Sequence, residues 1–197
     1  QEFVLTLALE ALKLKPVAVA TVERNSVDVA KAVQTISAAA PEAVVQISAY
    51  KSCAAYIRAA RKAGYGGGFY NVSFVGTQAL ADELGKEGAG VVVSQMMPTP
   101  YTNAKGISRE FIEMVRKSNG AVSANFSSME GYVAAKVMAE GLRRSSAKGG
   151  RDGLIAGLES ISNQSFGGFN VHFSPTDHVA SSFVELSMLT GDGRVRT

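Results

Sequence analysis

The chain has 197 residues, of which 46% are apolar and 19% charged, values that fit one globular domain or two small lobes. Its formal net charge is +3, but the only dense basic run, at 143–151, has no interleaved aromatic residue, which argues against a nucleic-acid partner. A single cysteine, Cys53, excludes an internal disulfide and a multi-cysteine metal site. The apolar start at 3–15 is interrupted by charges and lacks a basic leader, so it predicts neither a membrane span nor a signal peptide.

Strand-like and helix-like blocks alternate through the first half of the chain. They form three pairs and a final strand-like run, at 16–22 with 28–40, 43–48 with 51–64, 68–74 with 77–85, and 89–96. Near-continuous apolar strands joined by short helices are typical of a parallel sheet covered on both faces. We therefore expect a doubly wound α/β layer with parallel strands near 17–22, 43–48, 69–73 and 90–94.

Helices dominate the next part of the chain. The patterns predict helices at 108–120, 127–144 and 151–161, the second opened by a capping box of Ser127 and Glu130. Two alternating strands are expected within 168–189, around a turn at the Ser-Pro-Thr-Asp sequence. The loss of the strand-helix rhythm indicates that a second structural unit begins near Pro98 and Pro100.

The order of these elements resembles the C-terminal half of a type I periplasmic binding protein, and most of all the branched-chain amino-acid receptors of ABC importers. The resemblance extends from about residue 16 to 190 and rests on the segments 24–64, 69–85, 88–98, 127–145 and 167–178. It implies an α/β fold: the doubly wound parallel sheet of one lobe, plus helices and a hairpin of the partner lobe. In that family the helix containing Glu130, Gly131 and Tyr132 is a packing element.

The resemblance also implies a division into two lobes. Residues 1–97 with 182–197 correspond to the second lobe, whose first strand is missing, and 98–181 to the part that returns to the first lobe, whose sheet is absent. Because such receptors are about twice as long, the chain corresponds to a fragment or to a natural short form. The helices of 98–181 would then expose apolar surface, so we expect a homodimer or aggregation.

The resemblance places three ligand-binding candidates at strand ends, where open α/β sheets bind ligands. Tyr50 falls where the family has an aromatic residue over the ligand, Ser73 where an acidic residue commonly binds the ligand's ammonium group, and Phe74 follows it. Each candidate also has a structural alternative: Tyr50 as a half-buried aromatic residue at a strand end, Ser73 as a turn or cap hydroxyl, and Phe74 as a core residue. Because serine supplies no charge, aliphatic or aromatic carboxylates are expected alongside amino acids.

Other residues near strand ends have simpler explanations. Arg24 and Lys51 would suit an anionic ligand, but their interpretation as solvated charges is favoured. Asp28 stands at a helix start, where capping accounts for it. Cys53 also opens a helix, and a buried small residue is favoured over a nucleophile because neither histidine is near it in sequence.

The sequence contains no pattern typical of an enzyme. The glycines at 64–68 follow a helix and precede a strand, whereas a dinucleotide-binding loop runs from strand to helix. His172 and His178 flank a predicted turn with only Asp177 nearby, which is a weak metal pattern. We therefore expect no catalytic residue, metal or cofactor.

These observations predict an extracytoplasmic solute-binding protein that captures a small amino acid or related carboxylate for an ABC importer. The resemblance implies a small-molecule ligand and a membrane-bound ABC permease as partners, and a periplasmic or extracellular location. The alternatives are a ligand-sensing domain of a receptor or regulator, because one fold serves several functions, and an enzyme on a doubly wound fold.

Overall fold

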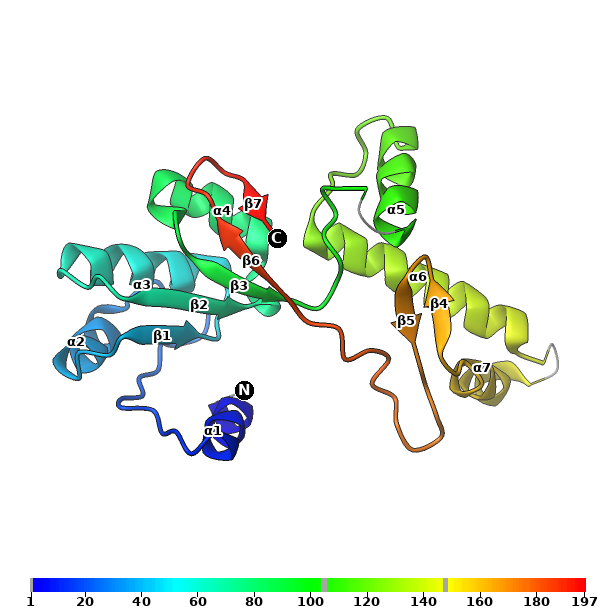
Figure 1. The fold of residues 1–197 in the computed structure, drawn as a ribbon, viewed down its shortest axis with the longest axis horizontal. Helices are drawn as coiled ribbons and strands as arrows, with labels where there is room; N and C mark the ends of the chain where they lie inside the picture. The colour runs from blue at the N-terminus through cyan, green and yellow to red at the C-terminus, as the bar shows by residue number, and fades with distance from the viewer. Residues whose placement is uncertain (1, 104–105, 147–148) are drawn as a thin grey trace. The chain divides into compact units, whose positions relative to one another are not determined.

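The computed structural model describes residues 2–103, 106–146 and 149–197 (Figure 1). Two compact units make up the chain: unit 1 comprises Gln1–Gln95 and Leu186–Thr197, and unit 2 comprises Met96–Glu185. Among the described residues, no helix has the length and apolar character needed to cross a membrane.

A five-stranded sheet forms the centre of unit 1. Its strands, in spatial order, are β1 (Ala43–Gln46), β2 (Gly68–Val72), β3 (Val92–Gln95), β6 (Glu185–Leu189) and β7 (Val195–Arg196). The first three strands pair in parallel, with Val44 opposite Phe69 and Tyr70 opposite Val92. β6 points the other way in Figure 1, and Leu189 exchanges backbone hydrogen bonds with Gly90 and Val91 at 3.0 and 2.9 Å. Three of the four strands predicted in parallel are thus confirmed.

Three helices of unit 1 contribute to the apolar cluster on one face of this sheet: α2 (Ala30–Ala38), α3 (Tyr50–Lys62) and α4 (Thr77–Leu84). Unit 1 also contains α1 (Glu2–Ala11) and the short 3₁₀ turns η1 (Ser73–Val75) and η2 (Gly85–Gly88). Ile57 of α3 and Leu80 of α4 are fully buried in one apolar cluster with Phe69 and Val93 of the sheet. α4 ends at Gly85, whose φ of 52° breaks the helix as the sequence predicted.

The strand predicted at 17–22 does not form. This segment is irregular, and Val17 and Val19 are 71% and 49% exposed, while Ala20 and Val22 pack against the core cluster. Its β-branched composition favours an extended chain, but a strand also requires a partner to complete its backbone hydrogen bonds. Within the described part of the chain, β1 pairs only with β2 and forms the edge of the sheet.

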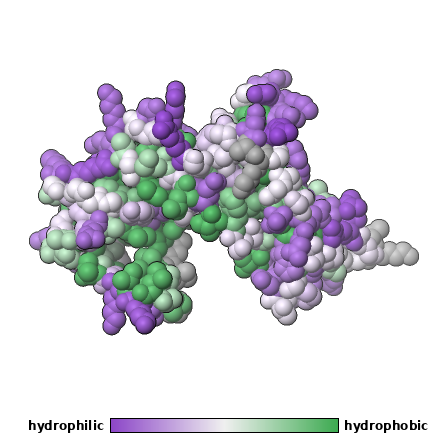
Figure 2. All heavy atoms as spheres, in the orientation of Figure 1, coloured by the Kyte–Doolittle hydropathy of each residue, from purple (hydrophilic) through white to green (hydrophobic). Residues whose placement is uncertain are grey.

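Apolar side chains remain on the surface of unit 1 around α1 and the segment after it. Figure 2 shows the corresponding green atoms, and the exposed residues include Leu7, Leu12 and Leu14. On the uncovered side of the sheet, Val45 and Tyr70 are 45% and 42% exposed. Unit 1 therefore buries one face of its sheet more completely than the other.

Three helices and a hairpin form unit 2. Its elements are α5 (Gly106–Lys117), α6 (Phe126–Arg144), α7 (Gly150–Glu159), β4 (Gln164–Phe166) and β5 (Phe169–Val171). Phe111 of α5, Met129 of α6 and Ile161, two residues after the end of α7, are fully buried with the hairpin residue Val171 in a second apolar cluster. Met138, Leu142 and Ile155 stay exposed on α6 and α7, as expected for helices of this part of the chain.

The predicted capping box of α6 is wrong by two residues. Asn125 is the N-cap: its side chain accepts a hydrogen bond from the Ser128 amide at 2.9 Å, and Ser128 Oγ accepts one from the Asn125 amide at 3.1 Å. Ser127 and Glu130 lie inside the helix. Ser127-x-x-Glu130 matches the general pattern of a capping box, but asparagine is at least as good an N-cap residue as serine. Here the Ser128 side chain accepts the hydrogen bond from the N-cap amide that a glutamate accepts in the general pattern.

The two strands predicted within 168–189 form but do not pair with each other. β5 pairs antiparallel with β4, which the sequence did not predict, through a turn at Gly167 and Gly168. β6 joins the sheet of unit 1. The predicted turn is present, because Ser174 and Asp177 form an isolated antiparallel bridge. Alternation located both strands, but their partners lie outside the predicted hairpin.

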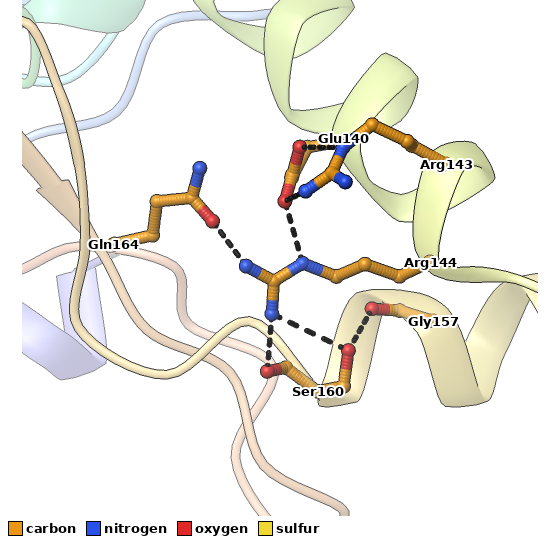
Figure 3. A network of polar contacts seen from close by, with 6 residues as sticks. All are labelled: Glu140, Arg143, Arg144, Gly157, Ser160 and Gln164. Carbon is orange, nitrogen blue, oxygen red and sulfur yellow. Dashed lines mark hydrogen bonds and ion pairs between the residues drawn. The ribbon is translucent and has the colours of Figure 1, made fainter.

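A network of polar contacts joins α6 to α7 and β4 (Figure 3). Arg144 donates to Glu140 Oε1 at 2.6 Å, to the Ser160 carbonyl at 2.6 Å and to Gln164 Oε1. Hydrogen bonds from Arg143 and Arg144 lower the pKa of Glu140 to about 2, so this carboxylate stays ionised near neutral pH. The guanidinium of Arg144 thus forms hydrogen bonds inside unit 2, and its role is structural.

Candidate functional site

The carboxyl ends of β1, β2 and β3 lie at one edge of the unit 1 sheet, because these strands run in parallel. α3 begins four residues after Gln46, the last residue of β1, and η1 directly follows β2. This edge therefore carries two of the predicted site segments. Tyr50 and Ser73 are 23 residues apart in sequence, and only the pairing of β1 with β2 places them after neighbouring strands.

Tyr50 is the first residue of α3. It is half-buried and packs against the core cluster of unit 1, and the ammonium group of Lys51 lies 5.9 Å from the centre of its ring. The residue before it, Ala49, offers no side-chain cap to the helix. The first turn of α3 therefore presents backbone N–H groups that no capping side chain satisfies, a setting that favours an anionic ligand group.

An open depression of about 330 Å³ adjoins Tyr50. Its other lining residues, Ala79, Asp82 and Glu83, come from α4. Gln78 donates to Asp82 at 2.8 Å, and Arg58 forms an ion pair with Glu83 at 3.0 Å. Sequence reasoning did not connect these carboxylates to Tyr50, since only the packing of α3 against α4 brings them together.

Ser73 and Phe74 form η1 with Val75. The Ser73 carbonyl accepts a hydrogen bond from the Gly76 amide at 3.1 Å, and Gly76 has a φ of 77°. Phe74 is 63% exposed, which contradicts the alternative that it is a core residue. An exposed aromatic ring and a half-buried serine therefore stand at the end of β2, one strand away from Tyr50.

The other residues near strand ends differ in how far they are buried. Arg24 lies in an exposed turn and Lys51 is exposed beside Tyr50. Asp28 accepts a hydrogen bond from the Ala30 amide at 3.3 Å, at the start of α2. Cys53 is 1% exposed, and burial raises the pKa of its thiol to about 12, so it stays protonated and unreactive at neutral pH.

The glycine run and the two histidines are the other patterns that the sequence singled out. Gly64 to Gly67 connect the end of α3 to the start of β2, at the amino end of that strand, as the sequence predicted. His178 Nε2 lies 3.0 Å from Glu159 Oε1. Within the ranges that the structure describes, no three metal-binding side chains gather around one point.

A family profile described as periplasmic binding protein matches residues 2–193. The chain belongs to the periplasmic binding protein family. This membership confirms the resemblance found in the sequence, and the parallel-rich central sheet agrees with the predicted fold class. No curated protein matches the chain.

Solved periplasmic binding proteins have the same fold as the chain. A "possible leucine/isoleucine/valine-binding protein" from Rhodopirellula baltica SH 1 is 27% identical with a TM-score of 0.80, covering 89% of this chain and 48% of that one. A substrate-binding periplasmic protein from Ralstonia solanacearum is 27% identical with a TM-score of 0.85, covering 96% and 55%. A leucine binding protein from Thermotoga maritima MSB8, at 17% identity and a TM-score of 0.72, covers 87% and 48% and supports the fold alone. The chain thus spans about half the length of these proteins.

Proposed function

We propose that this chain is part of an extracytoplasmic solute-binding protein that captures a small amino acid or related carboxylate for an ABC importer. The match of the periplasmic binding protein family over residues 2–193 carries the proposal. The strand-end edge of unit 1 supports it, because uncapped helix starts and an aromatic residue suit a ligand with a carboxylate. In this proposal the protein works in the periplasm, binds without converting its ligand, and delivers it to a membrane permease.

The proposed ligand contacts are Tyr50, Ser73 and Phe74. Their support is position: Tyr50 opens α3 and the other two form η1, both at the carboxyl edge of the sheet. Closure of a second lobe over this edge would shift an open-closed equilibrium toward the bound state. The homodimer expected from the sequence stays a prediction.

A ligand panel tests the proposed function. Leucine, isoleucine, valine and phenylalanine, and the corresponding carboxylates without the amino group, would be added to the full-length protein during thermal unfolding. At about one hundred times its dissociation constant, a true ligand adds roughly 2.7 kcal/mol to the free energy of unfolding. We expect one of the two classes to do this and to be recovered unchanged by NMR. Stabilisation by neither class, or conversion of the added compound, would contradict the proposal.

Ser73 provides a test of ligand charge. Replacing Ser73 by glutamate is expected to favour ligands that carry an ammonium group by on the order of tenfold, because a carboxylate forms charge-assisted hydrogen bonds. Ser73→Gln is the matched control, since it has the same length without the charge. The measurement is calorimetric titration of each variant with an amino acid and its deaminated analogue. Equal preferences in the two variants would place Ser73 away from the ammonium group.

A further inference from the structure

The turn that follows α5 contains an asparagine directly before a glycine. Asn119 and Gly120 have φ angles of 50° and 86°, both in the left-handed region. The Ala121 amide donates a hydrogen bond to the Ser118 carbonyl at 3.0 Å across these two residues. Positive φ at both central residues together with this hydrogen bond is characteristic of a type I′ turn, in which Asn-Gly is a preferred pair.

The two central residues of this turn lie open to solvent. Asn119 and Gly120 are both exposed, and a Cβ atom placed on Gly120 would meet no atom within 4 Å. Within the ranges that the structure describes, neither the Asn119 side chain nor the Gly120 amide forms a hydrogen bond to the protein. The fold therefore does not hold the side-chain carbonyl of Asn119 away from the peptide nitrogen that follows it.

These two groups can react with each other. After loss of its proton to a base in the solvent, the peptide nitrogen of the following residue attacks the carbonyl carbon of an asparagine side chain. The bond from that carbon to the side-chain nitrogen breaks, this nitrogen takes up a proton and leaves as ammonia, and a five-membered succinimide ring remains. Solvent then adds to one of the two ring carbonyls and opens the ring to aspartate or isoaspartate. Neither step needs an oxidant or a reductant, and asparagine is accordingly a thermolabile residue.

The other asparagines of the chain lack this combination of features. Of the seven, only Asn119 precedes a glycine, so only there does the attacking residue carry no side chain that hinders ring closure. Asn163 is also exposed and has a φ of 49°, but Gln164, the first residue of β4, follows it. The side chain of Asn125 is held as the N-cap of α6. These residues provide controls within the same molecule.

We propose that Asn119 is a site of spontaneous deamidation in the folded protein, with the Gly120 nitrogen as the nucleophile. The product carries a carboxylate, in an ordinary or an isoaspartyl linkage, directly after the end of α5. It lowers the net charge of the chain by one unit from +3. A negative charge is unfavourable at the C-terminus of a helix, but Arg116 and Lys117 in the last turn of α5 offset it. The modification is independent of the solute that the protein binds.

Peptide mapping of aged protein tests the site directly. The folded full-length protein would be incubated at mildly alkaline pH, where the attacking nitrogen loses its proton more readily, and then digested for mass spectrometry. We expect the mass gain that replaces an amide NH₂ by OH at Asn119, together with isoaspartate, which distinguishes the succinimide route from direct hydrolysis of the side chain. Asn163 and Asn125 should stay unmodified over the same time. An intact Asn119, or equal conversion of Asn119 and Asn163, would overturn the proposal.

A pair of glycine variants gives a second test. Asn119→Gly removes the reacting amide and suits a left-handed φ, so the turn should be kept. Asn163→Gly is the matched control, because it makes the same change at another exposed residue with positive φ. On isoelectric focusing after incubation, the acidic fraction should decrease in Asn119→Gly and stay the same in Asn163→Gly. An unchanged acidic fraction in Asn119→Gly would overturn the proposal.

Discussion

Replacing Gly157 by alanine is expected to destabilise unit 2 by about 3 kcal/mol, the upper range for overpacking a well-packed site. A Cβ atom at this position of α7 would lie 2.4 Å from the Gly141 carbonyl oxygen and 3.0 Å from the Ser145 amide nitrogen of the adjoining segment. Both neighbours are backbone atoms, so relief requires that α6 and α7 move apart. The midpoint of thermal unfolding should fall by roughly 6 to 12 °C.

Two glycines of the neighbouring helix α6, Gly131 and Gly141, provide matched controls for this substitution. Gly131 has open space where its Cβ would stand, so Gly131→Ala should stabilise the protein by about 0.5 to 1 kcal/mol through helix propensity. Gly141→Ala would meet Leu158 Cδ2 at 2.4 Å, the end of a flexible side chain, and should cost less than Gly157→Ala. Equal effects at Gly131 and Gly157 would show that the two helices do not pack as closely as described.

Tyr50→Ala is expected to weaken ligand binding by roughly tenfold to a hundredfold in the full-length protein. An aromatic ring over a ligand contributes buried apolar area and, for an ammonium group, a cation-π contact, together worth on the order of 1 to 3 kcal/mol. Tyr50 is half-buried and is the first residue of α3, so the fold should survive its truncation. Calorimetric titration with the ligand identified from the panel measures the effect.

Tyr50→Phe separates the ring from its hydroxyl. It keeps the aromatic face, so its affinity should stay within a few-fold of the unmodified protein if the ring provides the contact. Circular dichroism and the unfolding midpoint of both variants report whether the fold is retained. Unchanged affinity in a folded Tyr50→Ala protein would remove Tyr50 from the proposed site, while the family membership of the chain would stand.

The sequence by itself determined the elements and much of their order. Apolar runs and helical periodicity located β1, β2, β3, α3 and α4, because each pattern is local and reflects which side of an element is buried. The same local rules identified Gly85 as a helix end and placed Gly64 to Gly67 at the amino edge of the sheet, which excluded a dinucleotide loop. Several such segments in a family-like order were enough to predict the family that the profile match confirms.

Tertiary structure alone decided which elements pair and which side chains meet. The segment at 16–22 has the composition of a strand but no partner, and β5 and β6 join different sheets although they are neighbours in sequence. Backbone contact at Gly157 arises from packing between distant segments. Hydrogen-bond partners and close contacts depend on residues far apart in the chain, so no local pattern predicts them. Burial periodicity, in contrast, can be read within a single segment, because it follows from the repeat of a helix or strand.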